Sequence, residues 1–576
     1  MLTKNDMLSQ KAILGAATLV ALTISPAIAG RGSDGELKLL YWQAPSILNP
    51  YLSGGIKDVD ASSLVIEPLA HYDENGKIVP TLAAEVPTLG NNGISKDLMS
   101  ITWKLKPGIM FSDGSPFTAD DVVFTADYCM NLASGCNFLK NFQDVTTVEA
   151  LDPLTVKISF KVAKASPYGP FVGSQVPVLQ KAQFKDCTGA KAPHCTTANF
   201  GPIGTGPFKV VDFKANDRIR FVANGYYREP NKPAFASALF KGGGDAASAA
   251  RAVLETGEFD YGWNLQVEPD ILKQMQAAGK GKLNVAFGTG VERIETNFTN
   301  ADPSLGADKR SVYMDGKNPN PVLSDSAMRT ALSLATDRQV IVDAGYGSTG
   351  KVTCNVVPAP EAIASTTNDW CKTPNIDKAN KILDDAGWMK GADGVRVREG
   401  VRAQILFQTT TNSVRQGTQA LLKQMWQQIG VSVELRNINA SVFFGSDPSS
   451  PDTYQKFMAD LEMLANSMSG IDPEVYLASW TCGKIPQPSN NWIGPNGSRY
   501  CNKNYDALAG ELGQAAEPDK RANIAKMMND MLIADGVIIP LVHVGKASGI
   551  ANSIGGDKMN AWDSEMWNIA DWYRTK

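Results

Sequence analysis

The chain has 576 residues, which exceeds the size of one ordinary hydrophobic core, so we expect two or more domains. Its hydrophobic content of 43% and charged content of 20% are typical of a soluble globular protein. The formal net charge of −4 is too mild to indicate nucleic acid or an anionic membrane as a partner, and no basic run interleaved with aromatic residues occurs.

The first 29 residues have the pattern of a secretory signal peptide. Lys4 and Lys11 precede an apolar run over residues 12–24, and Ala27-Ile28-Ala29 provides an A-x-A cleavage site. A short membrane anchor is the alternative, but a run of about 13 residues is below the roughly 17–25 that span a bilayer. No cysteine follows the cleavage site, which argues against a lipid anchor. We therefore expect an exported, soluble, periplasmic product.

The mature chain is predicted to open with a strand, a loop and a helix. The strand covers residues 36–41 and leads into the loop 41–55. Residues 61–69 are predicted to be helical, and the segment 73–76, which ends in glycine, predicts a turn.

Residues 101–128 are predicted to form a strand, a turn, a second strand, another turn and a helix. Apolar and polar residues alternate over 101–105, which is the period of a half-buried strand. Asp113-Gly114 is a hairpin turn signal. Thr118 is the predicted N-cap of the helix, with acidic residues following at the positive end of its dipole.

The eight cysteines indicate disulfide bonds, because an even count in an exported chain is typical of a cross-linked protein. Eight thiols allow 105 connectivities. We favour pairing by proximity, since each pair would close a short local loop worth roughly 2.5–3 kcal/mol. The predicted pairs are Cys129 with Cys136, Cys187 with Cys195, Cys354 with Cys371, and Cys482 with Cys501.

The sequence lacks the usual motifs for catalysis, cofactor binding and metal binding. Residues 345–351 match G-x-x-x-x-G-K, but Val352 stands where a phosphate-binding loop has Ser or Thr. The three histidines, His71, His194 and His543, accompany no G-x-S-x-G or H-E-x-x-H motif, and no C-x-x-C occurs. We therefore predict no catalytic residue, no cofactor and no metal site.

A series of short segments, in order along the chain, resembles the signature of the peptide/nickel family of extracytoplasmic solute-binding proteins of ABC importers (family 5, cluster C), which includes oligopeptide- and dipeptide-binding proteins. The resemblance covers nearly all of residues 37–545. The matching segments are 67–69, 80–83, 111–123, 203–210, 254–260, 326–338, 379–388, 505–508 and 538–541.

The resemblance implies an α/β, two-lobed periplasmic-binding-protein fold of type II, with an enlarged first lobe, two hinge strands and an interlobe cleft. On this expectation residues 1–29 are the signal peptide, 30–290 plus 544–576 form the first lobe, and 291–543 form the second lobe. Each predicted disulfide would then lie within one lobe.

The resemblance also implies a function without chemistry. The protein would capture a peptide-like or related polar organic solute and deliver it to the permease and ATPase subunits of an ABC importer in the inner membrane. We expect a monomer with no nucleic-acid partner. A secreted hydrolase on an α/β scaffold is the alternative, and a chaperone-like or sensory role is a third.

Ligand-binding candidates come from five segments that the family places at its cleft. They are Trp42, Ser53, Gly54 and Gly55 in the loop 41–55, then Trp263 and Asn264, then Arg293, then Gln408, Thr409 and Thr410 at a strand end, and finally Met468, Ser469 and Asp472. Trp42 suits either core packing or stacking on a ligand. Arg293 suits either a ligand carboxylate or a surface or hinge salt bridge.

The position of Ser469 bears on the ligand class. In dipeptide and oligopeptide binders of this family, an Asp four residues before the Pro of a D-P or E-P pair binds the ligand's α-ammonium. Here Asp472-Pro473 is present but the earlier position is Ser469, which removes a charge-assisted bond of roughly 1.5–3 kcal/mol. An ordinary free-amine peptide is therefore in doubt unless Asp472 takes over the role. Opines, blocked or modified peptides, oligosaccharides and metal chelates stay open.

Overall fold

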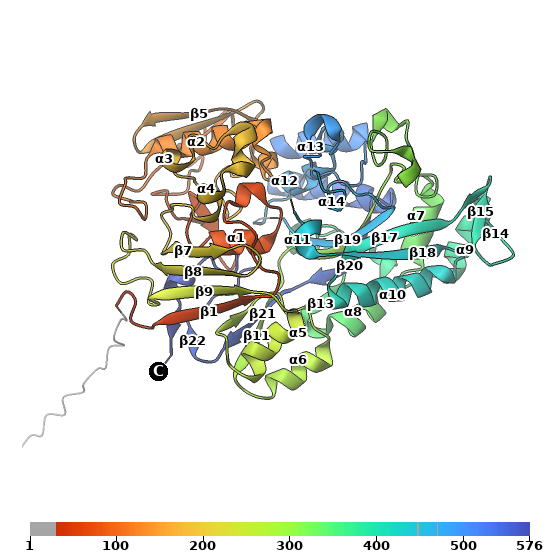
Figure 1. Ribbon diagram of the computed structural model, residues 1–576. Helices are drawn as coiled ribbons and strands as arrows, with labels where there is room; N and C mark the ends of the chain where they lie inside the picture. Colours follow the sequence, from red (N-terminus) through yellow and green to blue (C-terminus); the bar gives the residue numbers. More distant parts are fainter. Residues whose placement is uncertain (1–29, 446–448, 469, 516, 576) are drawn as a thin grey trace, which may run out of the picture.

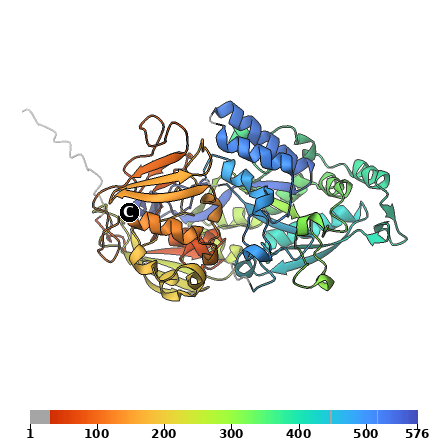
Figure 2. The same cartoon turned by 90° about the horizontal axis from the view of Figure 1, so that it is seen from above.

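The computed structural model describes residues 30–445, 449–468, 470–515 and 517–575. Its elements form two lobes that lie side by side, each built around its own β-sheet (Figures 1 and 2). The first lobe contains a seven-stranded sheet and the second a six-stranded sheet. The predicted signal peptide, residues 1–29, and Ser469 lie outside the described residues.

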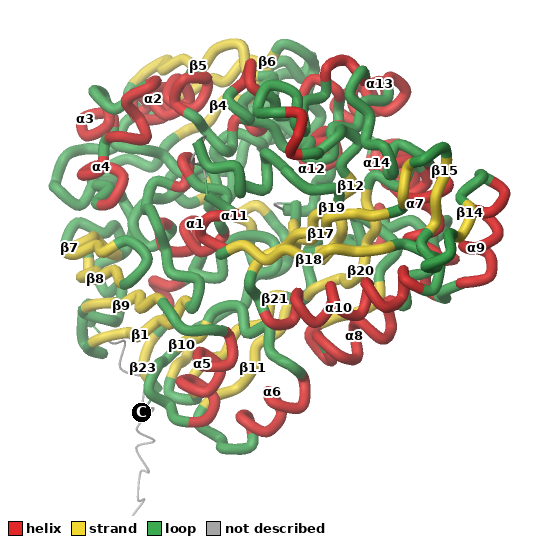
Figure 3. The backbone as a smooth tube through the Cα atoms, turned by 45° about the vertical axis from the view of Figure 1, so that its right-hand side comes forward, coloured by secondary structure: helices red, strands yellow, loops and turns green. Residues whose placement is uncertain are grey.

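The seven-stranded sheet has the order β11-β21-β10-β1-β9-β8-β7. Strand β1 has the alternating pattern of a strand with one buried face: Leu37 and Leu39 are fully buried, and the side chain between them is exposed. Helices α5 and α6 pack at its β11 edge (Figure 3). The bounds are β1 Glu36–Tyr41, β7 Phe208–Lys214, β8 Arg218–Ala223, β9 Ser237–Gly242, β10 Tyr261–Gly262, β11 Gly281–Ala286, β21 Lys546–Ala551, α5 Ala246–Ala250 and α6 Pro269–Gln276.

A smaller three-stranded sheet, β4-β6-β5, enlarges the first lobe, with helix α2 packed against it (upper left in Figure 1). Helix α2 begins as predicted, because Thr118 and Asp121 form a capping box in which the Thr118 N–H donates to Asp121 Oδ2 at 3.0 Å. The predicted second hairpin strand is wrong, since Met110 and Pro116 form only an isolated bridge. The bounds are β4 Ser100–Lys104, α2 Ala119–Met130, β5 Val145–Asp152 and β6 Thr155–Phe160.

The helix predicted over 61–69 lies earlier in the chain, at α1 Ile56–Ser62. The residues directly after α1 form a turn over 63–65, whose carbonyls are bound by the segment 204–208. The Gly206 N–H donates to the Val65 carbonyl at 2.8 Å, and the Phe208 N–H donates to the Leu64 carbonyl at 3.0 Å. These tertiary hydrogen bonds override the local helical pattern. The other first-lobe elements are β2 Ala70–Tyr72, β3 Ile78–Pro80, α3 Lys181–Phe184, α4 Thr196–Phe200, β22 Ile554–Gly555 and β23 Tyr573–Arg574.

The six-stranded sheet of the second lobe has the order β13-β20-β12-β19-β17-β18. Helices α8 and α10 run along one face of it, where Trp426 of α10 is fully buried against Phe407 (Figure 3). The strands are β12 Val291–Thr296, β13 Gly350–Val352, β17 Gln404–Thr410, β18 Ser432–Ile438, β19 Leu461–Asn466 and β20 Ile538–Val544, with β14 Met389–Lys390, β15 Arg396–Arg398 and β16 Val401–Arg402 in a separate small sheet. The helices are α7 Ser326–Leu334, α8 Arg338–Gly345, α9 Ile376–Asp385, α10 Ser413–Gln427, α11 Ala440–Phe443, α12 Glu474–Leu477, α13 Lys503–Gln514 and α14 Pro518–Ala534.

The chain passes between the two large sheets twice, from β11 to β12 and from β20 to β21. Since β11 pairs with β21 and β12 pairs with β20, the two crossings lie next to each other. The Val544 N–H donates to the Gly290 carbonyl at 2.8 Å and ties them together. Two adjacent connections of this kind form a natural hinge between lobes.

The four disulfides join the cysteines in the predicted pairs, with Cα–Cα distances of 5.1, 5.7, 5.7 and 4.5 Å in chain order. Each bond lies within one lobe, so none of them ties the lobes together. Cys129–Cys136 joins the end of α2 to the loop after it.

Removing the Cys354–Cys371 disulfide is expected to lower the free energy of unfolding by about 3 kcal/mol, because its loop of 17 residues gains freedom mainly in the unfolded chain. Urea denaturation of the Cys354→Ala/Cys371→Ala double variant, followed by tryptophan fluorescence, measures this change. A double variant with unchanged stability would contradict the expectation.

Candidate functional site

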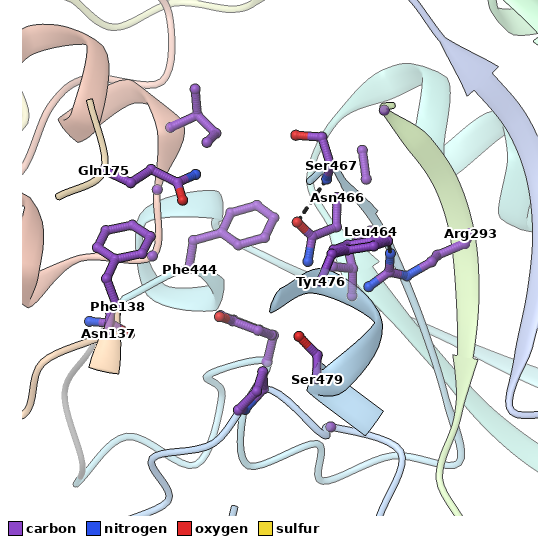
Figure 4. Close-up of a pocket in the computed structure, with 18 of the residues that line it drawn as sticks. Asn137, Phe138, Gln175, Arg293, Phe444, Leu464, Asn466, Ser467, Tyr476 and Ser479 are labelled. Carbon is purple, nitrogen blue, oxygen red and sulfur yellow. Dashed lines mark hydrogen bonds between the residues drawn. The ribbon is translucent and has the colours of Figure 1, made fainter. Parts of the chain in front are cut away.

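A cavity of about 280 Å³ lies between the two lobes. Figure 4 shows residues from both lobes facing it, with Phe138 and Gln175 on one side and Arg293 and Tyr476 on the other. Lining residues from the first lobe include Gly54, Gly55, Asn137, Phe138, Lys140, Gln143, Gln175, Trp263, Asn264, Lys546 and Glu565. Those from the second lobe include Arg293, Glu295, Arg415, Phe444, Tyr454, Leu464, Asn466, Ser467, Tyr476, Ser479 and Trp480.

The lobes touch each other around this cavity. The Gln455 side chain donates to Asn137 Oδ1 at 3.0 Å, and Lys164 of the first lobe forms an ion pair with Glu474 of the second. Near the hinge, the Gly470 N–H donates to the Trp562 carbonyl at 3.1 Å. Hydrogen bonds of this kind exist only when the lobes are together, so the structure shows a closed arrangement.

Trp263, which follows strand β10, forms an aromatic wall on the first-lobe side. It stacks on Tyr41 with ring centroids 5.1 Å apart and an interplanar angle of 9°. Trp42 does not line the cavity. Its indole N–H donates to the Asn264 carbonyl at 2.9 Å, so it supports the lining residues from behind.

Gly54 and Gly55 line the cavity, whereas Ser53 does not. The Ser53 hydroxyl is buried and donates to Asp58 Oδ2 at 2.6 Å, while its oxygen accepts the Gly55 N–H at 3.0 Å. Asp58 is also paired with Lys57 at 2.7 Å. The Ser53 hydroxyl and the Lys57 ammonium therefore both bind the buried carboxylate of Asp58.

Arg293 of β12 lies in the second-lobe wall and is only 2% exposed. Its guanidinium binds Glu295 Oε1 at 2.6 Å, donates to the Tyr476 hydroxyl and lies 5.1 Å from the ring centroid of Trp480. The sequence suggests either a ligand carboxylate or a salt bridge as the partner of Arg293. The structure shows a salt bridge, and it is buried.

Gln408, Thr409 and Thr410 lie in β17 beneath the wall and do not line the cavity. Gln408 is opposite Glu462 of β19, which is itself opposite Glu295 of β12. Burial, together with the charge of Glu295, raises the pKa of Glu462 well above its ordinary value, which favours a neutral carboxyl at this position.

A small annex of about 40 Å³ adjoins the cavity and shares Lys140, Gln175 and Tyr476 with it. Met468 and Asp472 line this annex rather than the main cavity. The Asp472 carboxylate is bound by Arg521 at 2.6 Å, so it is already neutralised. The predicted site residue Ser469 lies outside the described residues.

Most of the cavity wall was not predicted from the sequence, including residues 137–140, Gln143, Gln175, Phe444 and Tyr476. The segment 137–143 follows the Cys129–Cys136 disulfide, and Cys136 itself lines the cavity. The predicted disulfide was the one signal in the sequence that marked a rigidly held loop here.

The surroundings of His71 and the potential metal ligands bear on the alternative of an enzyme. His71 Nδ1 lies 3.1 Å from Asp563 and 3.4 Å from Ser174 Oγ, so both partners meet the same ring nitrogen and no proton relay results. Within the described ranges, no three His, Cys, Asp or Glu side chains group as metal ligands. Among the helices of those ranges, none is both long and apolar enough to cross a bilayer.

The comparison with protein families identifies the class of protein that contains this cavity. The model described as bacterial extracellular solute-binding proteins, family 5 (middle region), matches residues 77–487, well over half of the chain. The chain belongs to this family. This family 5 protein is therefore the solute-binding component of an ABC importer and not an enzyme, and the hydrolase alternative has no support. Its family works outside the cytoplasm with a permease and an ATPase.

Individual relatives can be aligned with most of the family 5 protein. It is 25% identical over 503 residues to protein XP55 of Streptomyces lividans, a match that covers 87% of this chain and 82% of that protein. It is 22% identical over 511 residues to the glutathione-binding protein GsiB of Escherichia coli K12, covering 88% and 89%. The oligopeptide-binding protein AppA of Bacillus subtilis, solved with a nonapeptide, has a TM-score of 0.78 at 20% identity and covers 95% of this chain and 100% of its own. The last similarity confirms the two-lobed fold.

Proposed function

We propose that this family 5 protein captures one compact, peptide-like or related polar organic solute between its lobes and delivers it for import. The observation that carries the proposal is the interlobe cavity, whose walls combine aromatic side chains with a few fixed polar groups from both lobes. Its volume of about 280 Å³ is near the lower end of the roughly 300–1,000 Å³ of small-molecule sites, which favours a compact solute over a long peptide. The relatives named for glutathione and solved with a nonapeptide support a peptide-like class.

The proposal includes the organisation of the chain. Residues 30–290 plus 544–576 form the first lobe and 291–543 the second, which puts the divisions at the two connections between the large sheets. The protein acts as a monomer, exported by residues 1–29 and without a lipid anchor. Because the solute touches both lobes only when they are together, its binding favours the closed state.

Native mass spectrometry of freshly purified protein tests this function. We expect one small organic solute bound per chain and recovered chemically unchanged after denaturation. A chain that is bare in every preparation and binds no solute from a periplasmic extract would contradict the proposal.

The Trp263→Ala variant is expected to bind the co-purifying solute more than tenfold more weakly, because the change removes the aromatic wall that stacks on Tyr41. Isothermal titration calorimetry measures the affinity, and Trp370→Ala is the matched control, since Trp370 is 43% exposed and lies away from the cavity. Normal binding by both Trp263→Ala and Arg293→Ala would show that the solute is held elsewhere.

A further inference from the structure

Lys140 lies where the cavity meets its annex and lines both of them. It belongs to the short 3₁₀ turn Leu139–Asn141, which follows the Cys129–Cys136 disulfide. The disulfide and the Gln455–Asn137 hydrogen bond hold the preceding residues in place. The Lys140 ammonium is thus presented to the cavity from a fixed loop of the first lobe.

Lys140 differs from every other charged side chain that lines the cavity. Each of the others has a partner within the protein: Arg293 with Glu295, Arg415 with Glu292, Lys57 with Asp58, Lys546 with the Asp563 carbonyl, and Glu565 with Tyr261 and Ser548. In the annex, Asp472 is paired with Arg521. The Lys140 ammonium has no hydrogen bond or ion pair with any residue that the structure describes.

The charges that act on Lys140 are positive. Burial, and to a smaller extent the nearby charges of Lys484 and Arg293 from the second lobe, together lower the pKa of Lys140 to about 8. Lys484 likewise forms no ion pair among the described residues, and its carbonyl accepts the Asn496 N–H beside the cavity-lining residues 493–495. A half-buried ammonium without a counter-charge is unfavourable, and an anion placed beside it removes that penalty.

We propose that the captured solute is anionic, and that one of its carboxylates binds Lys140 at the junction of the cavity and the annex. The inference rests on the proposed function and specifies its ligand class. A solute carboxylate there would receive a charge-assisted hydrogen bond from the first lobe and face the positive groups of the second. It would offset the repulsion between the lobes, so that closure is favoured when the site is filled.

Matched acid and amide probes test the inference directly. The probes are N-acetyl-dialanine, N-succinyl-dialanine and glutathione, each compared with the derivative whose carboxylates are converted to amides, and binding is measured by calorimetry at pH 7. We expect at least one acid to bind at least tenfold more tightly than its amide. Lys140→Gln should abolish this preference, while Lys140→Arg should keep most of it. Lys191→Gln, which removes an exposed lysine of the same lobe, should change nothing.

The outcomes separate this inference from the proposed function. Equal acid-to-amide preference in Lys140→Gln and the unmodified protein would overturn the role of Lys140. Binding of amides only, or of no probe at all, would overturn the anionic peptide-like class, whereas the capture function would still be judged by the co-purifying solute. A structural role alone would reduce binding of acid and amide equally.

The pH dependence gives a second readout. Because the pKa of Lys140 is about 8, acid affinity should be constant below pH 8 and fall above it, as the ammonium loses its proton. Among the described residues, the other ionisable groups around it are Lys484, whose pKa is also about 8, Arg293, the paired Asp472, and the tyrosines Tyr72, Tyr168 and Tyr476. Lys140→Arg should reduce the loss above pH 8, and Lys484→Gln should leave it in place. A loss that persists unchanged in Lys140→Arg would assign it to another group.

Discussion

The Arg293→Ala variant is expected to lose about 3–5 kcal/mol of unfolding free energy, the largest effect we predict for any cavity residue. The change leaves the Glu295 carboxylate buried and without its partner, since the two side chains are only 2% and 8% exposed and bind at 2.6 Å. It also removes the cation that lies over Trp480 and the donor to Tyr476. Glu295 would then face Glu462 of the neighbouring strand β19 without its own ion-pair partner.

Thermal and urea denaturation of four proteins separates these contributions. Arg293→Ala should be the least stable, and adding Glu295→Gln to it should recover part of the loss, because the unpaired charge is then gone. Arg251→Ala, which breaks an exposed pair with Glu255, should have little effect. If Arg293→Ala were as stable as Arg251→Ala, the buried pair would not hold the wall together.

The Gly204→Ala variant is expected to lose about 3 kcal/mol of unfolding free energy, the upper end of the usual cost of overpacking, because the added methyl group has no room. An ideal Cβ at this position would lie 1.9 Å from the Val65 carbonyl oxygen and 2.6 Å from its carbonyl carbon. Both are backbone atoms, so no side-chain rotation relieves the contact. The segment cannot move away freely either, since the Gly204 carbonyl accepts the Ser112 N–H at 2.9 Å.

Gly225→Ala is the matched control, because no heavy atom lies within 4 Å of its Cβ position. Comparing urea denaturation midpoints of the two variants shows whether the loss comes from the close approach or from glycine replacement in general. Similar midpoints for Gly204→Ala and Gly225→Ala would contradict the packing described for the first lobe.

Gly204 also shows why the family could be inferred from the sequence. It belongs to the segment 203–210, whose glycines bring two backbones into contact, and Thr118 begins α2 with a capping box. Both features require particular residue types at fixed positions, so they can be recognised in the sequence. The disulfide pairing was predictable for the same reason, because short loops limit which cysteines can meet.

The errors arise where tertiary contacts outweigh local preference. Residues 61–69 are apolar enough to suggest a helix, yet the backbone of Leu64 and Val65 bonds to the segment 204–208 instead. Residues 110–116 contain a turn signal but pair at a single bridge. The partner segment 204–208 cannot be recognised from the local sequence of residues 61–69.

The candidate site was predictable where it lies at strand ends and near the hinge. Gly54, Gly55, Trp263, Asn264 and Arg293 do line the cavity. Their role in binding a solute stays a prediction. The family resemblance predicts residues 408–410 at the cleft, but β17 lies between β19 and β18 and these residues are buried in the sheet without lining the cavity. The wall from residues 137–143 depends on how two lobes meet, which no local pattern encodes.

Small-angle X-ray scattering of solute-free and solute-saturated protein measures directly whether two lobes close over a captured solute. We expect a smaller radius of gyration with the solute, a return to the larger value after its removal, and the solute released unchanged. A protein that binds its solute with no change in dimensions, or that returns it chemically altered, would contradict capture by lobe closure.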